Sequence, residues 1–238
     1  MYSVYLNFSF NSVLLWNKNS GGVMLVGKVI ALSIGKEKSF TWKERNIQSA
    51  IGKEKVNEAI LTFDGFVGDG VANTAFHGGK ERAVCYYPYE HYKKWEEEFK
   101  ATINPPAFGE NICGTEFTEH NTYIGDIFSL GDAVVQVTQG RVPCSTISKY
   151  NQIDTFLSRI VETCYTGYFL KVLEEGVVSE RSTFQLLDRP QDKVSVWDAT
   201  KVMLLDRKNK DAMLSILQIE QLAEDWKNRY KKALEKIN

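Results

Sequence analysis

One cysteine stands in a sequence context that could support chemistry. Cys144 follows a proline and lies three residues after Arg141, at the end of a strong strand pattern. A guanidinium close to a thiol lowers the pKa of that thiol and favours the thiolate, which is the nucleophilic and metal-binding form. The alternative is a buried, inert thiol, which is the commoner role of an arbitrary cysteine. We interpret the other three cysteines, Cys85, Cys113 and Cys164, as structural.

Four segments combine glycines with polar residues, a composition that a purely structural core does not need. Glycine lets backbone N–H groups approach an anionic ligand closely, and a neighbouring basic residue can neutralise that ligand. Each segment alone is weak evidence, because Gly-Asp pairs usually form turns and a histidine before two glycines is more often structural than catalytic. The segments are 68–79, which contains His77, and 108–111, 139–144 and 166–176.

The overall composition narrows the class of protein. The 238 residues are 43% hydrophobic and 25% charged, which is typical of a globular chain with a sizeable core. Since 29 Lys and Arg face 30 Asp and Glu, we expect no general electrostatic binding to nucleic acid or to an anionic membrane. No apolar run is long enough to span a bilayer. The widely spaced cysteines indicate free thiols in a reducing, cytoplasmic compartment rather than a zinc site.

Short runs of β-branched and aromatic residues dominate residues 25–187. Turn-forming pairs such as Gly125-Asp126 separate them. Many short strands with regular turns favour a β-barrel or sandwich over a parallel sheet covered by helices. Helices are predicted over 88–99, which begins with a proline and has aromatic residues at helical spacing, and near 153–162. We therefore predict a mainly β fold of the α+β class.

The two ends of the chain differ from this pattern. Ser195 to Asp198 fits a capping box, and residues 189–238 predict a unit of three helices that packs on the barrel or on a partner. Residues 1–23 are rich in aromatic residues, Asn and Ser, and they make a poor signal peptide. Because a strand-like run follows Met24, we interpret residues 1–23 as an extension that is not native and residues 24–188 as the barrel domain. The alternative is an extra edge strand joined by a Gly-Gly hinge.

Taken together, these segments resemble the MOSC domain, a family named after the C-terminal domain of molybdenum-cofactor sulfurase. The matching elements cover roughly residues 25–187, and their order and spacing make chance a poor explanation. The helix around Trp226 is similar to the three-helix extension of bacterial two-domain members that are linked to resistance against 6-N-hydroxylaminopurine. In chain order the matching elements are 49–53, 66–69, 77–79, 108–111, 125–126, 139–144 and 166–168.

The sequence departs from the family pattern at several positions. Gly140 stands where a proline usually precedes the arginine, Tyr168 replaces a common tryptophan, and Asn73 stands where aspartate is frequent. Lys171 replaces a common arginine, so it keeps the charge but loses bidentate geometry toward an anion. None of these changes affects Cys144, the position of the metal ligand.

The resemblance implies a mixed β-barrel that binds the molybdenum cofactor, molybdopterin. It also implies that Cys144 ligates molybdenum beside the pterin dithiolene, and a soft thiolate suits such a sulfur-rich site. The metal and the pterin then carry the redox steps. We assign catalytic roles to Cys144 and His77, and cofactor contacts to Ser49, Lys53, Asn111, Arg141 and Lys171.

Each supporting role has a simpler alternative. Arg141 binds the cofactor phosphate or polarises the site, or it forms a surface salt bridge. Ser49 and Lys53 can converge on a phosphate, or they belong to a solvated loop. His77 could donate a proton during N–O reduction, because imidazole titrates near neutral pH, or it fixes the adjacent glycine turn. Asn111 could hydrogen-bond the cofactor.

Three classes of function compete. The first is a reductase that converts small N-hydroxylated compounds, such as hydroxylaminopurine or amidoximes, to amines or amidines. The sequence shows no flavin, haem or Fe–S motif, so we expect a separate electron-donating reductase protein. The second is a non-enzymatic carrier of the cofactor or its sulfur. The third, a hydrolase or acyl transferase built on Cys144 and His77, lacks an oxyanion-hole signature. For the first two we expect Ser49, Lys53, His77, Asn111, Arg141 and Cys144 to line one cleft, and cofactor loading to be partial in a recombinant preparation.

Overall fold

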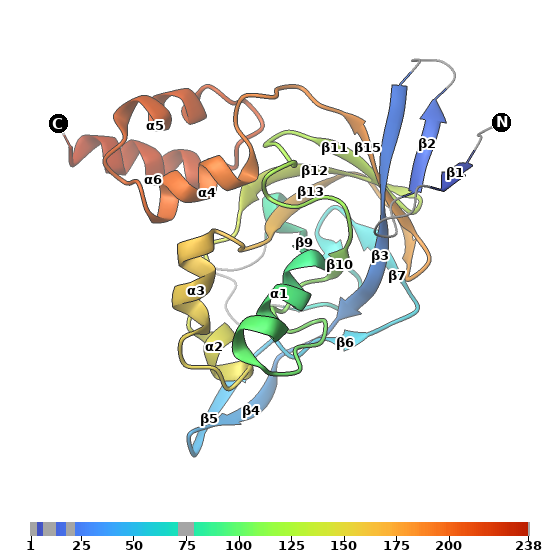
Figure 1. Ribbon diagram of the computed structural model, residues 1–238, viewed down its shortest axis with the longest axis vertical. Coiled ribbons are helices and arrows are strands. Elements are labelled where there is room, and N and C mark those ends of the chain that lie inside the picture. Colours follow the sequence, from blue (N-terminus) through green and yellow to red (C-terminus); the bar gives the residue numbers. More distant parts are fainter. Residues whose placement is uncertain (1–3, 7–12, 18–21, 71–78, 238) are drawn as a thin grey trace.

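A computed structural model describes residues 4–6, 13–17, 22–70 and 79–237 of the chain (Figure 1). The strands that build the main sheet are β1 (Val4–Leu6), β2 (Val13–Asn17), β3 (Gly22–Ile34), β6 (Glu54–Lys55), β9 (Val84–Pro88), β10 (Ile112–Gly114), β11 (Ile127–Leu130), β12 (Ala133–Gly140), β13 (Tyr168–Glu174) and β15 (Thr183–Asp188). The smaller sheets hold β4 (Lys38–Trp42), β5 (Arg45–Ser49), β7 (Glu58–Thr62), β8 (Gly65–Phe66) and β14 (Gly176–Ser179). The helices are η1 (Lys80–Arg82), α1 (Glu90–Phe99), α2 (Thr146–Tyr150), α3 (Phe156–Thr163), α4 (Val196–Leu204), α5 (Lys210–Leu217) and α6 (Glu224–Glu235).

The main sheet closes on itself. Among the described residues, seven strands form a ring in the order β3, β10, β9, β13, β12, β11 and β15, and β15 then pairs with β3. The pairing of β10 with β9 is parallel, and the other pairings in the ring are antiparallel. The predicted mainly β fold with a mixed barrel is therefore confirmed.

The barrel interior explains why these segments form strands. On most strands of the ring, alternate residues belong to one apolar core, and the buried residues are mostly β-branched or aromatic, which suits a pleated surface. On β12, for example, Val135 and Val137 are fully buried. Aromatic rings fill the centre, where Phe128 stacks on Phe184 with ring centroids 4.1 Å apart. This core fixes the register of the strands that later carry the site.

A second apolar cluster lies between the barrel and helices α1 to α3 (Figure 1). Trp95 of α1 and Phe156 of α3 meet edge to face at 5.6 Å, and both are fully buried. The two helices predicted near 88–99 and 153–162 correspond to α1 and α3. The short helix α2, which begins two residues after Cys144, was not predicted because only one turn of periodicity marks it.

The three helices after β15 gather on one side of the barrel (Figure 1). Ser195 and Asp198 form the predicted capping box at the start of α4, and the side chain of Asn209 caps α5. α6 contributes Trp226 and Tyr230 to the barrel core cluster. The three predicted helices are present, while the division of the chain into two domains stays a prediction. In the described part of the chain, no helix has the length and apolarity needed to cross a membrane.

The N-terminal strands extend the barrel sheet at one edge. β2 pairs antiparallel with β3, with Val13 opposite Val26, and β1 pairs with β2. This pairing agrees with the alternative that the first residues form an extra edge strand. The interpretation of residues 1–23 as an extension that is not native stays a prediction.

Candidate functional site

A cleft of about 690 Å³ opens beside the end of β12. Its walls come from the ends of β5 and β8, from β9, from the loop after β12, and from α6. The volume is in the range of small-molecule binding sites, roughly 300–1,000 Å³. Five of the residues that the sequence singled out line this cleft: Ser49, Lys53, Asn111, Arg141 and Cys144.

Two other predicted site residues are not among those that line the cleft. His77 lies outside the described residues, so its role stays a prediction. Lys171 lies on β13 opposite Gln136 of β12, in the middle of the ladder between these strands. Phe169, two residues earlier on the same strand, lines the cleft whereas Lys171 does not, and the predicted cofactor contact of Lys171 stays a prediction.

A polar network fixes one wall of the cleft. The ammonium of Lys53, whose side chain is 5% exposed, forms an ion pair with Asp69. Asp69 also accepts hydrogen bonds from the backbone of Gly35 at 2.9 Å and from the Asn111 amide at 2.8 Å. Asn111 accepts in turn from the backbone N–H of Cys85 at 3.1 Å. The charge of Lys53 is thus partly balanced, and Asn111 and Asp69 hold the wall in place.

The positive charge of Arg141 is differently placed. Its Nη1 lies 3.7 Å from the Sγ of Cys85, and its backbone N–H donates to the carbonyl of Gly167 at 3.1 Å. Among the described residues, no carboxylate forms an ion pair with Arg141. Three residues further on, Cys144 is half-buried in the same cleft. A thiol and a cation without a carboxylate partner therefore share one cavity, which suits an anionic or soft ligand.

Cys85 is a cleft residue that the sequence interpretation missed. It is buried in β9 as predicted, but it also lines the cleft and contacts Arg141. Strand alternation carries the signal, because Val84 and Tyr86 belong to the barrel core and Cys85 must face the opposite side. Burial raises the pKa of the Cys85 thiol, and the charge of Arg141 opposes that rise.

The opposite wall contains three charged residues that sequence reasoning also missed. Asp225 of α6 accepts from Arg82 at 2.6 Å and from Arg229 at 2.8 Å through the same oxygen, Oδ2. All three residues line the cleft. This wall could not be predicted from a local sequence pattern, because Arg82 and Asp225 are 143 positions apart and meet only in the folded chain.

Gly140 lets α6 approach this wall closely. A Cβ atom at Gly140 would lie 2.1 Å from Oγ1 of Thr200 and 3.0 Å from the ring of Trp226. Thr200 belongs to α4 and Trp226 to α6, so the helices pack directly over the residue that precedes Arg141. A proline at this position would place its Cβ in these contacts. The close packing of the helices therefore explains why this chain has glycine where the family usually has proline.

We expect alkylation to distinguish Cys144 from the other thiols. In the native protein at pH 8, iodoacetamide should modify Cys144 first, because it is half-exposed while the other three are buried. Burial raises the pKa of Cys113 well above its ordinary value and that of Cys164 to about 11, so these two stay protonated. Peptide mass spectrometry after short exposure measures the order. Faster modification of Cys113 or Cys164 than of Cys144 would contradict this assignment.

Comparison with known proteins agrees with the fold. The family model of the MOSC domain matches residues 73–182. The uncharacterised protein YflK of Bacillus subtilis is 37% identical over 210 residues, which cover 88% of this chain and 95% of YflK. A Gibberella moniliformis protein named reductase is 35% identical over 167 residues, which cover 66% of this chain and 29% of that protein. The crystal structure of YiiM from Geobacillus stearothermophilus superposes with a TM-score of 0.74 at 28% identity, over 87% of this chain and 99% of that one.

The mixed barrel with a cleft of small-molecule size defines the structural class of the chain, and the sequence matches identify the family. The chain belongs to the MOSC domain family.

Proposed function

We propose that the protein binds the molybdenum cofactor in this cleft and reduces small N-hydroxylated compounds. The observation that carries the proposal is the convergence of Cys144 and Arg141, a half-buried thiol and a cation without a carboxylate partner among the described residues. The relative that is named reductase supports the general class of activity. In balanced form, R–NHOH accepts two electrons and two protons and gives R–NH₂ and water.

The described residues fit a sulfur-ligated, anionic group. Cys144 supplies a soft thiolate ligand, and Arg141 supplies charge-assisted hydrogen bonds for a phosphate. The cleft volume of about 690 Å³ leaves room for a substrate beside such a group. When bound, the molybdenum cofactor supplies the two-electron redox chemistry.

The remaining cleft residues orient these groups and the substrate. Lys53, held by Asp69, adds a positive potential at the wall, and Ser49 also lines the cleft. Arg82 and Arg229, bridged by Asp225, form the opposite wall and present guanidinium edges to a polar substrate. In this proposal His77 remains the proton donor, and the electrons come from a separate reductase protein.

The compartment is part of the same proposal. All four cysteines are present as thiols without disulfides, which suits a reducing environment. We assign the protein to the cytoplasm on this ground, together with its electron-donating reductase protein.

The test is to express the chain in a host that makes the molybdenum cofactor, and to quantify bound molybdenum and pterin. Turnover of hydroxylaminopurine and of benzamidoxime is then measured with a reduced viologen dye as the artificial electron donor. We expect near-stoichiometric molybdenum and formation of the amine or amidine. Bound molybdenum without turnover would favour a carrier of the cofactor, and absence of molybdenum from such a host would contradict both functions.

A further inference from the structure

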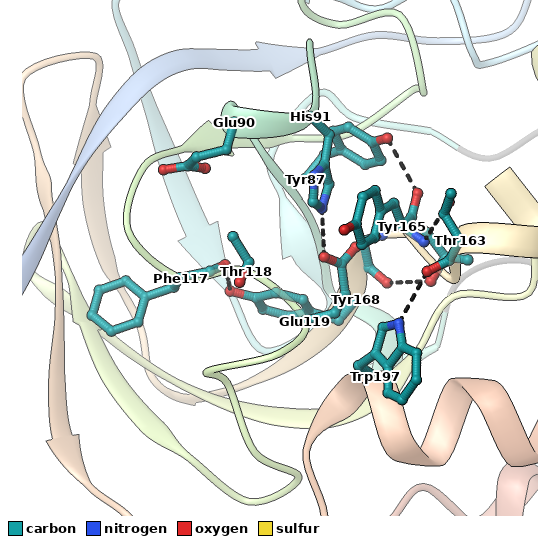
Figure 2. A network of polar contacts seen from close by, with 12 residues as sticks. Tyr87, Glu90, His91, Phe117, Thr118, Glu119, Thr163, Tyr165, Tyr168 and Trp197 are labelled. Atoms are coloured by element: carbon teal, nitrogen blue, oxygen red, sulfur yellow. Dashed lines mark hydrogen bonds and ion pairs between the residues drawn. The ribbon is translucent and has the colours of Figure 1, made fainter. Parts of the chain in front are cut away.

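A buried acid–base pair lies behind the cleft, outside the residues that line it. His91 of α1 and Glu119, in the segment after β10, meet with Nε2 and Oε2 2.6 Å apart (Figure 2). The side chain of Glu119 is fully buried and that of His91 is 6% exposed. Buried charges are costly unless they are paired and hydrogen-bonded, so such a pair calls for a role.

Aromatic rings fix the position of the imidazole. Its face stacks on Tyr165 with ring centroids 4.1 Å apart and an interplanar angle of 5°. Tyr87 packs against it edge to face at 5.7 Å. Figure 2 shows the imidazole beside these two rings, pointing at the Glu119 carboxylate. The imidazole therefore holds Glu119 in one orientation.

The second oxygen of Glu119 connects this pair to the cleft. Its Oε1 accepts the backbone N–H of Gly167 at 2.7 Å. Gly167 has a φ of 72°, and a Cβ there would lie 2.4 Å from the carbonyl oxygen of Tyr86, so glycine is required at this turn. The carbonyl of Gly167 accepts the backbone N–H of Arg141 at 3.1 Å. His91, Glu119, Gly167 and Arg141 thus form a continuous series of contacts.

The same carboxylate is held in its charged form. Burial alone raises the pKa of Glu119, but the charge of His91 and the hydrogen bonds from His91 and Gly167 outweigh it and lower the pKa. An ionised carboxylate accepts hydrogen bonds at both oxygens, which this arrangement needs. The backbone carbonyl of Glu119 accepts the backbone N–H of Trp197 at 2.8 Å. This bond connects the start of α4 to Glu119.

We infer that His91 and Glu119 are positioning residues that set the backbone of the Arg141–Cys144 loop through Gly167. Neither residue lines the cleft, and their effect on a ligand passes through the placement of Arg141. The identity of that ligand rests on the proposed function, whereas the control of the loop does not depend on it.

The test compares three side chains at position 119 by hydrogen–deuterium exchange of the cofactor-free protein. Glu119→Ala removes the acceptor for the Gly167 N–H. With β7 as the internal reference, we expect the peptide that contains Arg141 to exchange about tenfold faster in this variant than in the wild type. Glu119→Gln keeps an amide oxygen for Gly167 and an amide N–H₂ for a neutral His91. Exchange of the Arg141 peptide in this variant should remain within about twofold of the wild type.

Asp126 provides a matched control. It is a fully buried carboxylate that accepts from Arg189 at 2.8 Å and from the backbone N–H of Tyr123 at 2.9 Å, and it does not line the cleft. Asp126→Ala should lower the melting temperature without accelerating the Arg141 peptide relative to β7. Equal acceleration in the Asp126 and Glu119 variants, or none in a folded Glu119→Ala protein, would overturn the inference.

If Glu119→Ala does not fold, a pair of variants at His91 tests the same positioning role. His91→Gln keeps a donor near the position of Nε2, whereas His91→Leu removes it, so only the leucine variant should loosen the Arg141 peptide. Equal exchange of this peptide in the two His91 variants would also overturn the inference. Bound molybdenum, measured in parallel, should fall in the variants that loosen the loop. If no variant and no wild-type sample holds molybdenum, the proposed function fails while the exchange comparison still decides the role of the pair.

Discussion

Replacing Cys144 by serine should abolish reductase turnover while leaving the fold intact. Serine is nearly isosteric with cysteine, but its hydroxyl stays protonated near neutral pH and is a poor ligand for a soft metal site. Loss of residues that merely orient a metal ligand typically costs about 10–100-fold, so loss of the ligand itself should cost more than about a hundredfold. The measurement is hydroxylamine turnover per protein, together with bound molybdenum and the melting temperature.

Cys113→Ala is the control for this experiment. Cys113 is fully buried in the cluster beneath α1 and does not line the cleft, so its loss should cost packing energy and no activity. Cys85 is unsuitable as a control because it lines the cleft beside Arg141. Full turnover in Cys144→Ser would show that the Cys144 thiolate is not required for the reaction.

Replacing Arg141 by alanine should weaken retention of the cofactor. The substitution removes charge-assisted hydrogen bonds worth about 1.5–3 kcal/mol, which corresponds to roughly a tenfold to hundredfold loss of affinity. Because Cys144 remains, turnover per bound molybdenum should fall much less than the molybdenum content. Molybdenum retained after gel filtration, followed over time, measures the effect.

Two further variants serve as comparisons for Arg141→Ala. Arg141→Lys keeps the charge without the bidentate geometry and should retain an intermediate amount of molybdenum. Arg159→Ala removes a surface guanidinium that pairs with Glu98 and Glu162, far from the lining of the cleft, and should retain the wild-type amount. Unchanged retention in Arg141→Ala would mean that this guanidinium does not hold the cofactor.

Local patterns predicted most of the fold. Short β-branched and aromatic runs with turn residues indicated a barrel or sandwich, and the family resemblance specified the barrel. The capping box at Ser195 located the start of α4 closely. The short helix α2 escaped because a helix of five residues shows too little periodicity. Which strands pair was not predictable from one sequence, since β3 meets both β10 and β15 across long stretches of chain.

Segments that combine glycine with polar residues led to cleft residues such as Asn111 and Arg141, because their composition differs from that of a core. The site was missed where its residues look ordinary. Cys85 lies within an apolar strand, and Arg82 and Asp225 come from distant segments whose contact exists only after α6 packs on the barrel. Lys171 is not among the residues that line the cleft, and its predicted cofactor contact stays a prediction.

The position of α6 after all the barrel strands in chain order also bears on the order of assembly in the cell. Chains leave the ribosome N-terminus first, and the strands that carry Arg141 emerge long before α6. Until α6 packs over Gly140, the cleft lacks the wall that Asp225, Trp226 and Arg229 provide. The complete cleft therefore exists only after α6 has emerged and packed on the barrel, so the cofactor of the proposed function would enter a chain in which α6 is already folded.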